Sequence, residues 1–159
     1  MTRLLPVLAC AVLLAAGCGY GVGAGASRLP EGTGKVFVPS LENRTTDAEA
    51  GALVGAALRE ELARRGASGG EGSRARITGE VTRSSASPVT TQGGTWRLVL
   101  EVQARLVVDG TPGARVQVRQ EVDYLGEVDA IATEGRRRLA LQRAASDAAR
   151  EIVERLEGP

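Results

Sequence analysis

The stretch WRLVLEVQARLVV, residues 96–108, decides the fold because apolar side chains stand at every second position along it. Residues two apart point to the same face of a β-strand. The apolar face is formed by Trp96, Leu98, Leu100, Val102, Ala104, Leu106 and Val108. We therefore predict a long strand with this face, Trp96 included, packed against a core and with the odd-numbered face turned outward.

Segments on both sides of this stretch repeat its pattern. After a predicted hairpin loop, residues 109–113 (DGTPG), the apolar face continues in Ala114, Val116, Val118, Val122 and Tyr124. Before it, Ala75, Ile77, Gly79 and Val81 alternate with polar residues, and residues 84–94 read as a loop. All three consecutive strands place apolar residues on one face and polar residues on the other, so their antiparallel register is well specified.

Two helices and a short strand complete the pattern. Residues 35–39 (KVFVP) indicate a short strand that Pro39 limits, and residues 41–46 indicate a turn. Thr46 and Glu49 fit a capping box for a helix that ends at Gly66. A second amphipathic helix is predicted over residues 133–156, with an apolar stripe of Leu141, Ala145, Ala148, Ile152 and Leu156.

The order of these elements is β-α-β-β-β-α. A sheet with one apolar face buries it best under the two amphipathic helices. The predicted fold class is therefore α+β, a two-layer sandwich with both helices on one face of a roughly four-stranded mixed sheet. We expect residues 35–159 to form this single domain.

The N-terminus reads as an export signal. Arg3 precedes a run of about 13 mostly apolar residues, too short to span a bilayer as a helix, which needs roughly 20. The run leads through LAAG into Cys18, the pattern of a lipoprotein signal that is removed over residues 1–17 and leaves lipid on Cys18. Residues 18–34, rich in Gly, are then a lipidated tether that holds the protein to a membrane. The alternative is an ordinary secreted protein cleaved near Ala16, with Cys18 a free thiol.

Composition excludes several functions. The sequence has no His, and its other cysteine, Cys10, lies in the predicted signal. Zinc sites and Ser-His-Asp or Cys-His nucleophile systems therefore lack their side chains, so we expect no enzyme, metal or cofactor. Without Arg3, the mature chain carries 19 basic and 19 acidic residues, a balance that gives no electrostatic argument for nucleic acid.

Several of these features together resemble the LptE family, the lipopolysaccharide-assembly lipoproteins of the outer membrane. They are the start Cys18-Gly19-Tyr20, the strand ending at Pro39, the turn LENRT over residues 41–45, and the element order. The resemblance covers essentially the whole mature chain. It implies an anchored protein on the periplasmic side of the outer membrane that plugs an LptD-like β-barrel, helps it assemble and aids lipopolysaccharide transport. Gly19 after the cysteine resembles the sorting pattern of outer-membrane lipoproteins.

A barrel lumen is lined by polar side chains, and the odd-numbered sheet face offers matching groups. Its candidate contacts for the barrel or for lipopolysaccharide are Arg97, Arg105, Arg115 and Arg119. The alternative is that this face sees only solvent, as one side of most antiparallel sheets does.

Lipid recognition in the family is placed near the loop between the second and third strands. Here that loop, residues 84–94, carries no basic residue. The dense basic cluster is instead Arg136-Arg137-Arg138, near the start of the last helix, where cations oppose the helix dipole. A compensating anion from the barrel or from lipid phosphate is one interpretation, and a solvated charge run is the other.

Another outer-membrane lipoprotein with a small α+β domain remains an alternative, either a peptidoglycan-synthase activator or a CsgG-like secretion component. The strand, turn and helix around Pro39 also suit those proteins. They tend to repeat a strand–helix unit, whereas this chain places three strands in succession.

Overall fold

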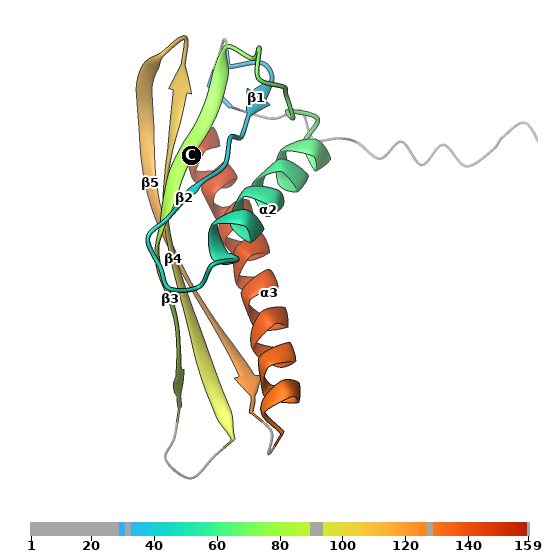
Figure 1. Ribbon diagram of the computed structural model, residues 1–159. Helices are drawn as coiled ribbons and strands as arrows, with labels where there is room; N and C mark the ends of the chain where they lie inside the picture. The colour runs from blue at the N-terminus through green and yellow to red at the C-terminus, as the bar shows by residue number, and fades with distance from the viewer. Residues whose placement is uncertain (1–28, 31–32, 90–93, 127–128, 159) are drawn as a thin grey trace, which may run out of the picture.

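The computed structural model describes residues 29–30, 33–89, 94–126 and 129–158. Figure 1 shows one sheet with both helices on the same side of it. The elements in chain order are β1 (Val36–Phe37), β2 (Glu42–Asn43), α2 (Ala50–Arg64), β3 (Ala75–Pro88), β4 (Thr95–Val108), β5 (Thr111–Leu125) and α3 (Ala130–Glu157). The predicted two-layer α+β sandwich is confirmed. The predicted signal, Cys18 and most of the tether lie outside the described residues.

The sheet is mixed and has the strand order β1-β3-β4-β5, with β2 also paired to β3. β1 and β2 run parallel to β3, and β3, β4 and β5 are antiparallel neighbours. The predicted first strand over residues 35–39 is in fact shorter, and Glu42–Asn43, expected in a turn, is a second short strand. Pro39 between them has no N–H for a continuous ladder, which accounts for the division.

β3 is longer than its apolar alternation indicated. It continues through residues 84–88, which were expected in a loop, as far as the pair Pro88–Trp96. The turn at the end of β4 is also shorter than predicted. Asp109 and Gly110 alone connect β4 to β5, with φ angles of 50° and 79°. Two positive φ angles match the tight turn that suits the twist of a hairpin, so β5 starts three residues earlier than the DGTPG loop implied.

The core lies between the sheet and the helices. From the sheet it contains the alternating residues Ile77, Val81, Leu98, Leu100, Val102, Leu106 and Val118, each at most 2 % exposed. The predicted stripe of α3 is buried from Leu141 to Leu156. Trp96 is a correction: it lies half-buried opposite Tyr124, because it is the second residue of β4 and stands at the end of the sheet.

The predicted capping box is wrong. α2 begins at Ala50, and neither Thr46 nor another side chain caps it. In the loop before it, Asn43 donates to the Asp47 carbonyl at 2.7 Å and accepts from the Thr45 hydroxyl at 2.8 Å. The polar side chains of this loop thus form hydrogen bonds within the loop and none to the first N–H groups of α2.

Glu61 on α2 is an unexpected part of the interior, at 5 % exposed. It pairs with Arg64 and with Arg65, whose Nε lies 2.6 Å from its Oε1. Arg65 also reaches Glu157 of α3 at 2.7 Å. A buried carboxylate needs such partners, so this cluster joins the C-terminal ends of the two helices.

Candidate functional site

The outward face of the sheet carries opposite charges that pair with each other at one end. Arg97 donates two hydrogen bonds to Asp123, at 2.7 and 2.9 Å. Arg119 lies 2.9 Å from Glu101 on β4 and 2.7 Å from Glu121 on its own strand. The hydrogen bonds from Arg97 hold the pKa of Asp123 below its usual range. Two of the candidate contact residues, Arg97 and Arg119, are thus engaged within the chain.

The other two candidates on this face, Arg105 and Arg115, have a different environment. They are direct cross-strand partners in the β4–β5 pair. Arg115 donates to the amide oxygen of Gln103, and neither arginine forms an ion pair with any residue in the described part of the chain. Both line a surface hollow of about 480 Å³. The structure therefore brings two unneutralised cations together near the β4–β5 hairpin.

The basic cluster of α3 is divided among three environments. Arg137 lies 2.7 Å from Asp47, in the loop before α2, and 2.9 Å from Glu134. Arg138 lies 3.0 Å from Glu49. The chain thus supplies the compensating anions for these two arginines, which the sequence suggested a barrel or a lipid would supply. Arg136 lies on a different side of α3, in the pocket described below.

Asp47 is the centre of the contact that fixes α3 to the loop before α2. Its side chain is 8 % exposed and also accepts a hydrogen bond from Ser84 at 3.1 Å. Burial acts to raise the pKa of Asp47, but the hydrogen bond and charge of Arg137, with the hydrogen bond from Ser84, outweigh it, and the pKa lies below its usual range. Arg137 is accordingly a structural residue, with its pKa raised by Glu134 and Asp47.

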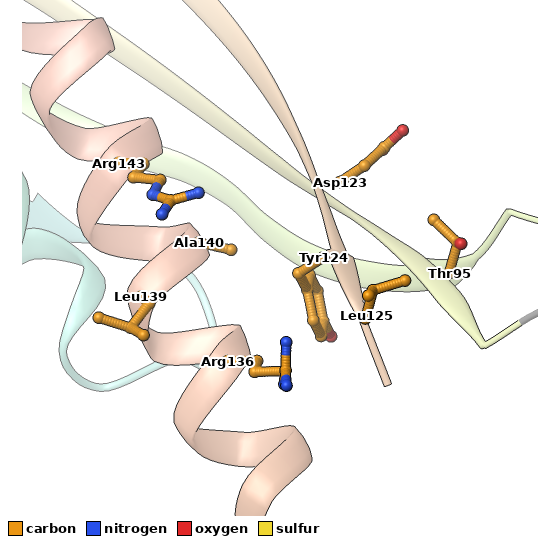
Figure 2. Close-up of a pocket in the computed structure, with 8 residues that line it drawn as sticks. All are labelled: Thr95, Asp123, Tyr124, Leu125, Arg136, Leu139, Ala140 and Arg143. Atoms are coloured by element: carbon orange, nitrogen blue, oxygen red, sulfur yellow. The ribbon is translucent and has the colours of Figure 1, made fainter. Parts of the chain in front are cut away.

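A pocket of about 300 Å³ lies where the start of β4 and the end of β5 face α3 (Figure 2). Figure 2 shows its lining side chains: Thr95, Asp123, Tyr124, Leu125, Arg136, Leu139, Ala140 and Arg143. Arg136 and Arg143 are two helical turns apart and therefore share a side of α3. Burial raises the pKa of the Tyr124 phenol.

This pocket is amphipathic. Leu125 and Leu139 are each 57 % exposed beside the two guanidinium groups, and Ile131, at the start of α3, is 83 % exposed. Arg143 and the exposed leucines were missed from the sequence. The signal was present, since Arg136, Leu139 and Arg143 stand at positions i, i+3 and i+7 of the predicted helix.

Other kinds of site are not found in the described residues. These residues contain no cluster of His, Cys, Asp and Glu suited to a metal ion. Among their helices, none has the length and apolar character needed to cross a membrane. The described surface does carry paired and unpaired arginines, carboxylates and an amphipathic pocket.

Comparison with solved structures shows the same fold in other proteins. The chain resembles a putative lipoprotein from Caulobacter crescentus CB15, with 22 % identity and a TM-score of 0.62 over 86 % of this chain and 93 % of that one. It also resembles a minor lipoprotein from Acinetobacter baumannii (16 %, TM-score 0.53, 77 % and 90 %) and the rare lipoprotein B from Shewanella oneidensis (16 %, TM-score 0.52, 76 % and 92 %). At these identities the likeness shows the fold alone, an α+β domain that these lipoproteins share.

The family follows from sequence. Residues 33–156 match the model of the LptE lipopolysaccharide-assembly family, and the chain belongs to that family. It is a family of non-enzymatic lipoproteins, so the chain is not an enzyme. No curated protein matches the chain.

Proposed function

We propose that this chain is an outer-membrane lipoprotein, anchored through lipid on Cys18 and facing the periplasm, that plugs an LptD-like β-barrel and aids its assembly and lipopolysaccharide transport. The observation that carries the proposal is membership of the lipopolysaccharide-assembly family over residues 33–156. The polar outward face of the sheet is consistent with contact to the polar wall of a barrel lumen.

The amphipathic pocket is the part of the surface best suited to lipopolysaccharide. An anionic glycolipid presents phosphate groups next to acyl chains. The pocket offers Arg136 and Arg143 for phosphate and Leu125 and Leu139 for apolar contact. Of the three arginines of the α3 cluster, Arg136 is the one that lines this pocket, and we assign the lipid contact to it on that ground.

Affinity purification tests the role as a plug. The tagged, lipidated chain is purified from detergent-solubilised outer membrane, with a Cys18→Ala variant as the control for anchoring, and the retained proteins are identified by mass spectrometry. A stoichiometric large β-barrel that resists high salt supports the proposal. Recovery of a peptidoglycan synthase or a secretion component in its place would favour the other small α+β lipoproteins.

Lipid binding is tested with the purified domain and lipopolysaccharide in detergent. We expect Arg136→Gln/Arg143→Gln to lower the affinity about tenfold or more, because each lost charge-assisted contact is worth roughly 1.5–3 kcal/mol. Arg150→Gln is the matched control, since Arg150 is exposed on the same helix and pairs only loosely with Asp147, at 3.7 Å. Equal affinities of the two variants would exclude the pocket as the lipid site.

A further inference from the structure

The outward face of the sheet is divided into two halves with different charge balance. In the half nearer the pocket, Arg83, Arg97 and Arg119 pair with Glu101, Glu121 and Asp123. The half nearer the β4–β5 hairpin contains Arg105 and Arg115, which we call the arginine pair. The contrast shows that unpaired charge is confined to one end of this face.

The arginine pair is unfavourable in the isolated chain. Residues directly opposite on one face of an antiparallel pair have Cβ atoms about 4.5–5.5 Å apart, and like charges there are destabilising. The nearest acidic side chains of the hollow are Glu80 and Glu42, and Arg44 engages both, at 2.7 and 3.7 Å. Within the described residues, the positive charge of Arg105 and Arg115 is thus left without a carboxylate.

Most of the side chains that line the hollow around the arginine pair are polar or charged. Its other lining residues include Thr78 and Gln103, and an adjoining hollow of about 380 Å³ adds Gln117. The exposed large apolar residues, Val89, Leu125, Ile131 and Leu139, all belong to the opposite end of the molecule, where β3 and β5 end and α3 begins. Among the described residues, the most exposed large apolar side chains, which could contact acyl chains, therefore lie away from the arginine pair.

A protein surface that carries carboxylates fits these groups. A guanidinium group binds a carboxylate through two parallel hydrogen bonds, and the amides of Gln103 and Gln117 can bind either backbone or side-chain groups beside it. One acidic group placed between Arg105 and Arg115 would turn their repulsion into attraction. This charge complementarity selects an acidic protein patch over a glycolipid.

We propose that the arginine pair is the docking site for paired acidic side chains of a partner protein. It lies near the β4–β5 hairpin, whereas the amphipathic pocket lies where β4 begins and β5 ends. Figure 1 shows these two regions of β4 and β5 at opposite ends of the sheet. This proposal rests on the proposed function only for the identity of the partner, which would be the barrel. The full lipidated chain thus has one end suited to protein and the other suited to lipid.

Site-specific photo-crosslinking in cells tests the proposal. A photoreactive phenylalanine replaces Gln117, next to Arg115, and the crosslinked peptide of the partner is sequenced. The matched control replaces Arg150 on α3. We expect a protein adduct from position 117 whose peptide contains Asp or Glu, with roughly a tenfold lower yield in an Arg105→Gln/Arg115→Gln background. A charge swap gives the converse test. The Arg105→Glu/Arg115→Glu chain should lose the adduct, and replacing the contacted acidic residues of the partner with arginine should restore the crosslinking yield of that chain.

Folding of the variant is checked separately. Since like charges are removed, Arg105→Gln/Arg115→Gln should keep or raise the thermal midpoint of the purified domain, which separates lost docking from lost structure. An adduct with lipopolysaccharide, or a yield that the substitutions leave unchanged, would overturn the docking site. An adduct through acidic residues of a protein other than a β-barrel would support the docking site and refute the proposed function. A co-purified barrel with no adduct at position 117 would support the proposed function and refute the docking site.

Discussion

The contact between Arg137 and Asp47 makes a sharp prediction, because one partner is deeply buried. The carboxylate of Asp47 is 8 % exposed in the wild-type chain, and in Arg137→Gln it keeps the hydrogen bond from Ser84 but loses its cation. Removal of one partner from a fully buried ion pair costs about 3–5 kcal/mol. Since Arg137 itself is 29 % exposed and water can reach its place, we expect a loss of about 2–3 kcal/mol in the free energy of unfolding at pH 7.

The assay is denaturant unfolding of the domain with its thermal midpoint measured in parallel. For a domain of this size, the expected loss corresponds to a fall in midpoint of roughly 10 °C. Arg138→Gln is the matched control: its side chain and that of Glu49 are both at least half exposed, so the change should be below about 1 kcal/mol. Equal losses in the two variants would refute the reasoning.

The pH dependence gives a second test of the same contact. The pKa of Asp47 is lowered in the folded chain, so its contribution to stability is present above the unfolded pKa, near 3.9, and is lost as pH falls through the folded value. Without Arg137, burial dominates and raises that pKa. The difference in stability between wild type and Arg137→Gln should therefore shrink as the pH is lowered from about 6 to about 3. A difference that is constant with pH would mean that Asp47 is not the affected group.

Three further substitutions test the fold. Gly79→Ala should lower the free energy of unfolding by about 1–3 kcal/mol, since the added Cβ would overlap the Gln103 carbonyl oxygen. Gly70→Ala, with open space around it, should be nearly neutral in the same denaturant titration. Trp96→Ala should cost roughly 2 kcal/mol by thermal unfolding, less than the 3–5 kcal/mol of a fully buried aromatic residue, because the indole is half-buried. Gly110→Ala should cost about 1 kcal/mol in denaturant unfolding, because φ is +79° at the hairpin turn, and a neutral result there would argue against this turn.

The sequence predicts the layers of this fold well, because its strongest signals are periodic. Alternation over residues 96–108 assigns β4 and its buried face, and the apolar stripe of α3 assigns the helix above it. The short strands β1 and β2 are different. Each has only two residues, too few to show an alternation of apolar and polar side chains. Both strands form because β3 offers a free edge to a parallel partner. Such pairing is a property of the assembled sheet.

The candidate site could be predicted only in part, for a related reason. Arg97, Arg105, Arg115 and Arg119 all stand at outward positions of alternating strands, and the pattern treats them alike. What distinguishes them is the residue directly opposite on the neighbouring strand. Arg97 faces Asp123 and Arg119 faces Glu101, whereas Arg105 and Arg115 face each other. That residue depends on register, which is set by the two-residue turn at Asp109 and Gly110 together with the register shift between Arg105 and Val107. A five-residue loop, as the sequence suggested, would have changed every cross-strand pair.

The three arginines at the start of α3 need separate substitutions, because their surroundings differ. Substituting Arg136, Arg137 and Arg138 together would lower lipid binding through Arg136 and stability through Arg137, and a single affinity could not separate the two. Arg136 shares the pocket with Arg143, whereas Arg137 is committed to Asp47. The informative lipid-site variant is therefore Arg136→Gln/Arg143→Gln, which leaves Arg137 and Arg138 unchanged. A loss of lipopolysaccharide binding in that variant, with the thermal midpoint unchanged, would assign the pocket to lipid on grounds that no folding defect could explain.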